Sequence, residues 1–221
     1  MSTRVTATSI IDAIVEDMRR RIFEGTLTQG TAQTEAEVSG HYEVARPTAK
    51  AAIERLVAEG LLERGLHKSA RVKVLDSAEV RDIYTARAIV ESEVVRRLAT
   101  TATVPARAVA ANELIKARIS EEASAIIDPD MDFHTALVNA LGNKRTSSMY
   151  ASLLGEVRLC MSRVQSLRLL DSAKIAAEHS KILEYIAAGD SLAAALTLEA
   201  HLAQARDLLA NEIGPDLKDS F

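Results

Sequence analysis

Three of the five histidines, His134, His179 and His201, fall on the apolar faces of three separate predicted helices. Each has aliphatic residues three, four or seven positions away, which is the spacing of one helix face. A carboxylate, Asp130, lies one helical turn before His134. Because a buried polar group is costly unless it is paired, three inward imidazoles require three partners. The pattern predicts a metal or anion site inside an all-helical domain, with a shared cation as the simplest common partner.

The spacing of Asp130 and His134 allows one helix to supply two ligands to the same ion. His179 and His201 would then close the site from two other helices. Imidazole and carboxylate together suit Zn, Ni, Fe or Mn, and the sequence does not choose among them. Four protein ligands can close a tetrahedral structural site, or can leave positions open for a small carboxylate or hydroxyacid. The alternative for any one histidine is a structural role, with its ring hydrogen-bonded to a backbone carbonyl.

A second group of residues has the chemistry of DNA recognition. Arg46, Thr48 and Lys50 stand at the start of a predicted helix, where side chains reach base edges or phosphates in a major groove. The segment from Arg64 to Lys73 is basic and holds no acid, so His67 and Lys68 are candidates for contacts with a minor groove or with phosphates. The alternative is that Arg46 and Lys50 only solvate an exposed helix face.

The elements that must position this second group are three helices and a hairpin. Apolar positions from Ile11 to Ile22 predict the first helix, and Thr34 with Glu37 forms a capping box that opens a short one, 35–42. Pro47 marks the start of the third helix, which Gly60 ends. Alternation over 61–64 and 71–75 predicts two strands. Residues 1–75 are therefore predicted to form a winged helix-turn-helix domain.

The histidines lie in a second predicted domain, residues 76–221. Asp76 and Glu79 form another capping box, and about six helical patterns follow with short breaks between them. Helices of this length bury their apolar faces best in a bundle. The predicted fold is mainly α, with a winged helix-turn-helix followed by an all-α sensing domain.

Composition agrees with this division. Apolar residues make up 48% of the chain and aromatic residues 3%, so the cores must be built from aliphatic side chains, which favours helices. The net charge is -4, but residues 1–75 carry +1 and the rest −5. The single cysteine, Cys160, excludes an internal disulfide. With no apolar run of about 20 residues and no leader pattern, we expect a soluble cytoplasmic protein.

The order of residues also resembles a known family. Gly25-x-Leu27, Glu35-x-Glu37-Val38, Val44-Ala45-Arg46 and Leu56-x-x-Glu59-Gly60-Leu61 look like the DNA-binding domain of the GntR family of bacterial transcription regulators. The second domain is similar to the ligand-sensing (FCD) domain of the FadR-like branch. The matching segments there are Asp82-Ile83-Tyr84-x-x-Arg87-x-x-x-Glu91, Asp130-x-x-Phe133-His134, Leu141-Gly142-Asn143, Glu178-His179-x-x-Ile182-Leu183 and Ala200-His201-Leu202. About six helices resemble the shorter, VanR-like version of that domain.

The resemblance implies roles for particular residues. Asp130, His134, His179 and His201 match the family's metal-binding positions, and Arg87 is the implied cationic partner of an effector, with Arg158 as a weaker candidate. Arg87 has an alternative partner in Glu91, its i+4 neighbour. Two departures fall in the DNA-binding half, where Ala45 replaces a usual Ser and Lys50 a usual Arg. The loss of a serine helix cap costs about 1 kcal/mol, and Lys lacks the bidentate fork that reads guanine.

These observations predict a homodimeric, metal-containing transcriptional regulator, in our interpretation a repressor, whose affinity for double-stranded DNA changes when a small organic acid binds. It is expected not to be an enzyme. A metal-dependent hydrolase is the rival from another class, because a histidine-rich site with bound water can hydrolyse substrates. Against that rival, Glu178 is expected to point away from the site. A third interpretation is a constitutive DNA binder with a purely structural metal.

Overall fold

The computed structural model describes residues 9–65, 68–119, 121, 123–166 and 171–213. The chain divides into two compact units, Met1–Val74 and Leu75–Phe221, one residue from the boundary that the sequence predicted. The fold is mainly helical, with a winged helix-turn-helix first and a helical unit second, which confirms the predicted fold class.

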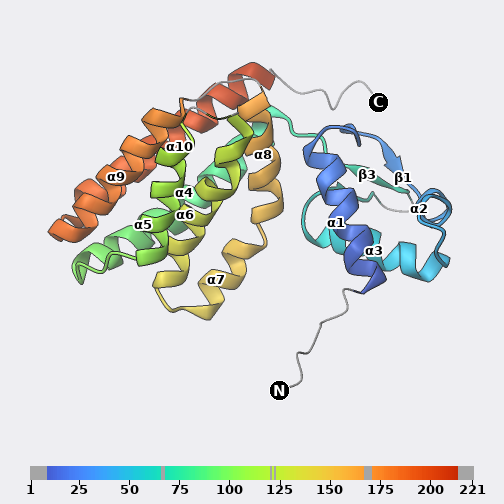
Figure 1. Cartoon of the computed structure of the whole chain (residues 1–221), viewed down its shortest axis with the longest axis horizontal. Helices are drawn as coiled ribbons and strands as arrows, with labels where there is room; N and C mark the ends of the chain where they lie inside the picture. Colours follow the sequence, from blue (N-terminus) through green and yellow to red (C-terminus); the bar gives the residue numbers. More distant parts are fainter. Residues whose placement is uncertain (1–8, 66–67, 120, 122, 167–170, 214–221) are drawn as a thin grey trace. The chain divides into compact units, whose positions relative to one another are not determined.

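The described residues of the first unit form three helices and a small sheet (Figure 1). Its elements are α1 (Ile10–Phe23), β1 (Ala32–Gln33), α2 (Glu35–His41), α3 (Arg46–Ala58), β2 (Leu62–Glu63) and β3 (Ala70–Val72). The strands are antiparallel in the order β1-β3-β2, with Leu62 opposite Val72 and Ala32 opposite Arg71. The sequence predicted the β2–β3 hairpin but not β1. That strand is two residues long and shows no alternation of its own, so its pairing depends on β3.

Local signals explain where these helices begin. Thr34 accepts a hydrogen bond from the Glu37 amide and the Glu37 carboxylate accepts one from the Thr34 amide, which confirms the predicted capping box of α2. The N-cap of α3 is Ala45, and it makes no side-chain hydrogen bond. The core of the unit lies between α1 and α3, where both helices bury aliphatic stripes. These stripes are Ile14, Val15, Met18 and Ile22 from α1, and Ala49, Ala52, Ile53 and Leu56 from α3.

Among its described residues, the second unit holds seven α-helices, not about six. They are α4 (Ser77–Thr100), α5 (Ala106–Ala117), α6 (Ile127–Ala140), α7 (Lys144–Ala151), α8 (Leu154–Ser166), α9 (Ser172–Ala188) and α10 (Ser191–Ile213), with a 3-10 turn, η1 (Ala123–Ile126), before α6. The extra helix arises because the single helix predicted from Lys144 onward is interrupted at Ser152–Leu153 and forms α7 and α8. No Gly or Pro stands at Ser152–Leu153 to indicate a helix end in the sequence. The helix number therefore differs from that of the shorter, VanR-like version of the domain.

Helix α4 is the element that assembles this unit. It packs along α10 and also contacts α6, α8 and α9, as Figure 1 shows. The capping box of Asp76 and Glu79 that starts it is present as predicted. Its buried stripe includes aliphatic residues and two charged ones, Arg87 and Glu91, so its inner face carries charge into the core. No helix among the described residues is long and apolar enough to span a membrane.

Candidate metal centre and nucleic-acid interface

The four residues that the sequence singled out come together inside the second unit. Asp130 and His134 are on α6, His179 is on α9 and His201 is on α10. One ligand atom from each residue can be chosen so that all four atoms lie within 4.8 Å of one another. All four residues are buried, and His201, at 8%, is the most exposed. We call this group the histidine cluster.

The distances within the histidine cluster identify which atoms face inward. His179 Nε2 lies 3.4 Å from His201 Nε2 and 3.6 Å from Asp130 Oδ1, and His134 Nε2 lies 3.9 Å from Asp130 Oδ2. The Nε2 atom of His134 is buried without a hydrogen-bond partner in the described structure. Three imidazole nitrogens and a carboxylate therefore point at one small volume.

Two further carboxylates hold the histidines from outside. His134 Nδ1 donates to Glu91 Oε2 at 2.5 Å, and His201 Nδ1 donates to Glu178 Oε2 at 2.7 Å. These bonds place the protons on Nδ1, so that both Nε2 atoms present lone pairs to the cluster interior. The expectation that Glu178 points away from the site holds for the centre of the site only. It does not face the centre of the cluster, but it contacts the outer nitrogen of His201, which lies on another helix.

The third histidine is held by packing. The ring of His179 stacks on Phe133 with centroids 3.7 Å apart and planes 5° apart. Its Nδ1 is buried without a hydrogen-bond partner among the described residues. Burial, with the neighbouring His201 and His134, lowers the pKa of His179 well below its usual value. Burial also lowers the pKa of His134, although Glu91 opposes this shift. Both rings are therefore neutral near pH 7, which is the form that binds metals.

This donor set fits a divalent transition metal. Three neutral imidazole nitrogens and one carboxylate are ligands of Zn and of its neighbours in the first row. The orphaned Nε2 of His134 supports a cation at this place, because an unpaired buried polar atom in a protein interior otherwise costs about 1–3 kcal/mol. The Glu91–His134 and Glu178–His201 pairs are the carboxylate–histidine arrangements that orient metal ligands elsewhere.

Glu91 makes more contacts than its sequence position indicates. Its spacing predicted a pair with Arg87 and its place in the family motif implied no role, yet it is fully buried and accepts hydrogen bonds from three residues. Arg87 Nε donates to Oε1 at 2.9 Å, Tyr150 OH donates to Oε1 at 2.8 Å, and His134 binds Oε2. Burial opposes ionisation of Glu91, but His134 and Arg87 outweigh it and hold the pKa of the carboxyl below its usual value. A signal existed in the sequence, since Glu91 lies on the apolar stripe of its helix.

The two arginines predicted for the effector have different surroundings. Arg87 is 2% exposed, pairs with Glu91, and lies over the Tyr84 ring with its guanidinium carbon 5.3 Å from the centroid. Burial would lower the pKa of Arg87, but Glu91 raises it, so the cation persists. Arg158 on α8 donates to Asp128, whose side chain is 70% exposed, and contacts Met131 Sδ at 3.9 Å. The structure thus puts Arg87 beside the cluster and Arg158 against a surface carboxylate.

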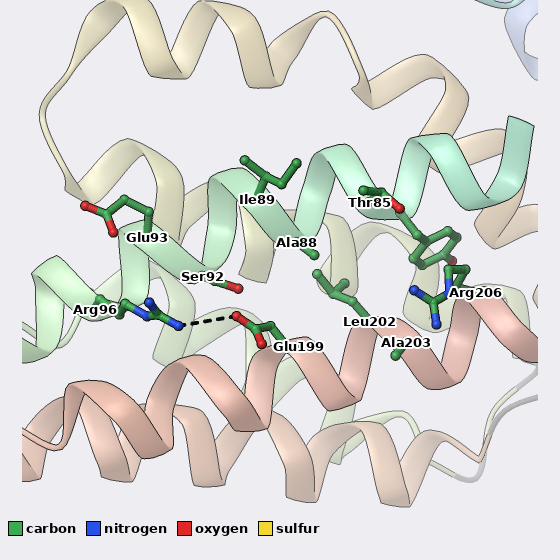
Figure 2. Close-up of a pocket in the computed structure, with 11 residues that line it drawn as sticks. Thr85, Ala88, Ile89, Ser92, Glu93, Arg96, Glu199, Leu202, Ala203 and Arg206 are labelled. Carbon is green, nitrogen blue, oxygen red and sulfur yellow. Dashed lines mark hydrogen bonds and ion pairs between the residues drawn. The ribbon is translucent and has the colours of Figure 1, made fainter.

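Two hollows lie near these helices. A groove of about 500 Å³ runs between α4 and α10 and is bordered at one end by the Arg96–Glu199 ion pair and at the other by Arg206 (Figure 2). None of the four cluster residues lines it. A much smaller cavity of about 10 Å³, the size of one water, is lined by His201, Glu178 and Lys174 among others. It lies at the Glu178–His201 edge of the histidine cluster.

The predicted DNA-contacting residues lie on the first unit. Arg46 and Lys50 are exposed at the start of α3, Thr48 is half-buried, and Lys68 is exposed in the loop between β2 and β3. Lys50 Nζ is 3.7 Å from Glu54 Oε1, a surface pair four residues apart. His67 lies outside the described residues. The structure therefore presents Arg46, Lys50 and Lys68 to solvent, as a DNA contact would require.

Comparisons with known proteins agree with both halves. Residues 10–72 match the gntR family of bacterial regulatory proteins, and residues 82–204 match the FCD domain. The chain is 30% identical over 144 residues to the Nta operon transcriptional regulator of Aminobacter aminovorans, a stretch covering 64% of this chain. The chain spans 65% of the length of that relative.

Solved structures show the same fold. A GntR protein from Rhodococcus sp. RHA1 superposes with a TM-score of 0.76 at 22% identity, over 91% of this chain and 97% of that one. E. coli McbR/YncC gives a TM-score of 0.68 at 15% identity, over 94% and 100%. The FCD domain TM0439 in its Zn2+-bound form gives 0.53 at 19% identity, over 63% and 97%. The gntR family model and the Nta operon relative both describe transcriptional regulators, so the family matches favour the regulator over the hydrolase interpretation. The chain belongs to the GntR family of bacterial regulatory proteins and carries an FCD domain.

Proposed function

We propose that this protein is a metal-containing transcriptional repressor that binds operator DNA as a homodimer in the cytoplasm and responds to a small organic acid. The observation that carries the proposal is the histidine cluster. Three imidazoles from three helices and one carboxylate converge within 4.8 Å in the core of the FCD domain.

The bound metal is proposed to be zinc, with Ni, Fe or Mn as the other ions that this donor set suits. Asp130, His134, His179 and His201 would be its ligands. The relative that was solved with Zn2+ bound shares the fold of this domain and supports the choice of zinc. Such a metal acts as a Lewis acid that can hold a carboxylate oxygen directly.

The effector is proposed to be a small carboxylate or hydroxyacid. Four protein ligands leave positions open on a metal that accepts five or six. Arg87 supports the assignment, because its charge reaches His134 and His179 and helps to lower the pKa of both. A buried cation beside a metal favours an anion between them. Arg158 remains a weaker candidate, since Asp128 already accepts its hydrogen bond.

The DNA-binding part of the proposal rests on α3 and the hairpin. In a helix-turn-helix the second helix of the motif enters the major groove with its first residues against the bases, and here these are Arg46, Thr48 and Lys50. Lys68 and His67 are proposed to reach the phosphates or the minor groove. A two-fold dimer would place two such helices about 34 Å apart, one turn of DNA, and effector binding would change that separation.

Metal content is the experiment that tests the proposal first. Untagged protein purified without chelator should carry about one equivalent of metal per chain by plasma mass spectrometry. His134→Ala should lose it, whereas His41→Ala, an exposed histidine of the DNA-binding unit, should keep it. A folded wild-type protein that carries no metal and takes up no added Zn or Ni would overturn the metal part of the proposal.

DNA binding is tested separately. Fragments selected by the protein from a random DNA pool should shift in electrophoresis, and the affinity should fall steeply with salt. A carboxylate panel should then release the DNA from wild type but not from His179→Ala. If His179→Ala loses metal but still folds and still responds to the acid, the metal is structural and the sensing role is wrong.

A further inference from the structure

One residue joins the histidine cluster to the cation beside it. Glu91 lies on α4 and receives hydrogen bonds from His134 on α6, from Tyr150 on α7 and from Arg87 one turn earlier on its own helix. Its exposed fraction is 0%, and those of His134, Tyr150 and Arg87 are 1–2%. These hydrogen bonds are therefore shielded from bulk solvent.

Three donors converge on the two oxygens of this carboxylate. Oε1 accepts from the Arg87 Nε–H and from the Tyr150 hydroxyl, and Oε2 accepts from the His134 Nδ1–H. An ionised carboxylate is acceptor-only and can satisfy all three. A glutamine would bring two N–H donors to face other donors, so no neutral isostere reproduces the arrangement.

We propose that Glu91 is a positioning residue that couples metal binding at His134 to anion binding at Arg87. This inference rests on the proposed function, because it assigns to Glu91 the linkage between the two ligands of the same site. Glu91 touches neither ligand. It acts through the side chains of His134 and Arg87, which its two oxygens hold at the same time.

The physical basis is the sharing of one negative charge. A cation on Nε2 makes the imidazole a stronger donor through Nδ1, so more of the Glu91 charge is engaged by His134. Less of that charge then neutralises Arg87, and the guanidinium attracts an added anion more strongly. An anion on Arg87 in turn leaves Glu91 free to support His134. By thermodynamic reciprocity, each ligand raises the affinity for the other by the same factor.

The test measures zinc affinity with and without acetate, a simple carboxylate that binds zinc weakly in solution. Chelator competition gives the zinc Kd of the full chain, and the ratio of the two Kd values is the coupling factor. Wild type should bind zinc more tightly with acetate present. Glu91→Gln should bind zinc about 10- to 100-fold more weakly, which is the usual effect of removing a carboxylate behind a metal-ligating histidine. Its coupling factor should be smaller than that of wild type, and the coupling that remains is that of acetate bound directly to the zinc.

Two comparisons separate positioning from general damage. Glu93→Gln removes an exposed acid two residues away that pairs with Arg97, and should leave both the zinc Kd and the coupling factor unchanged. If Glu91→Gln does not fold, Glu91→Asp keeps the charge but is one methylene shorter, so it cannot hold His134 and Arg87 together. Its coupling factor should fall while zinc still binds.

The outcomes distinguish this inference from the proposed function. Coupling that persists unchanged in folded Glu91→Gln or Glu91→Asp overturns the role of Glu91 and leaves the metal and effector sites standing. A wild-type protein that binds zinc with no acetate effect contradicts both the linkage and the effector part of the proposed function. A wild-type protein that binds no zinc removes the metal site itself.

Discussion

His179 Nε2 and His201 Nε2 lie 3.4 Å apart in the core of the FCD domain. Because Glu178 holds the proton of His201 on Nδ1, the Nε2 atom of that ring can only accept. A metal-free protein must therefore place the His179 proton between the two rings, which leaves His179 Nδ1 unpaired. A cation bound at His179 Nε2 requires that proton to move to Nδ1, so metal uptake near pH 7 should switch the tautomer of His179 without releasing a proton.

The metal-free protein should lose stability as the pH falls. The pKa values of His134 and His179 are lowered in the fold, so below the ordinary value of about 6.5 the unfolded chain binds protons that the folded chain does not. Below pH 6.5, each of these histidines lowers the free energy of unfolding by up to about 1.4 kcal/mol per pH unit. Above about pH 6.5 neither histidine changes it. The pKa of Glu91 is also lowered in the fold. The ionised Glu91 therefore contributes its full stabilisation above about pH 4.5, and this contribution is lost as the pH falls further.

Urea unfolding in the presence of a chelator at pH 7.5, 6.5 and 5.5 measures this dependence. His179→Leu packs an apolar side chain on Phe133 in place of the imidazole. It should reduce the slope of unfolding free energy against pH, below pH 6.5, by the equivalent of about one proton. A wild-type protein with equal stability at pH 7.5 and 5.5 would mean that the buried rings accept protons without cost.

A second prediction concerns the start of α3, the proposed recognition helix, whose N-cap residue makes no side-chain hydrogen bond. Ala45→Ser should stabilise the first unit by about 1 kcal/mol, because a serine hydroxyl at the N-cap can accept from a first-turn amide of α3 that Ala45 leaves without a side-chain partner. Chemical denaturation measures the change, and Thr34→Ala, which removes the capping box of α2, should cost a similar amount. No gain from Ala45→Ser would show that water already satisfies those amides.

The parts of the structure that follow from short-range spacing could be predicted from the sequence. The capping boxes at Thr34 and Asp76 depend on residues three apart, and both are present. The histidines and Asp130 could be placed in one core because they lie on the apolar faces of three helices, and three such faces in one bundle leave little room for another arrangement. Arg87 and Glu91 could be paired because they are one turn apart on α4.

What the sequence missed depends on contacts between distant elements. Tyr150 reaches Glu91 from α7, and Glu178 reaches across to His201 on another helix, so neither spacing nor periodicity indicates the contact. The break after Ala151 has no glycine or proline to mark it. The strand β1 exists only because Gly30 and Thr31 bond to Val72, about 40 residues later.

A third prediction concerns the turn between α2 and α3. Glu43 has a φ of 52°, in the left-handed region that costs a residue with a Cβ about 1 kcal/mol or more. Glu43→Gly should remove this strain, although glycine also has the larger conformational entropy in the unfolded chain, which opposes the gain. The net effect should be a stabilisation of the unit by about 0.5 to 1 kcal/mol. Ala51→Gly inside α3 is the matched control and should destabilise by about 1 kcal/mol. A loss of stability in Glu43→Gly would indicate that the side chain itself supports the turn.

The last prediction separates phosphate contacts from base contacts on the proposed recognition helix. If Lys50 meets a phosphate, Lys50→Ala should weaken binding to all DNA sequences alike and reduce the slope of log affinity against log salt by about one. If Arg46 forms a bidentate pair with guanine, Arg46→Ala should cost about 1–3 kcal/mol on the selected sequence and much less on random DNA. Fluorescence anisotropy over a salt series, with selected and scrambled duplexes, measures both. Arg64→Ala, an exposed arginine after β2, is the control for loss of positive charge. Equal effects of all three variants on both duplexes would mean that α3 contributes only general positive charge, and that sequence is recognised elsewhere in the protein.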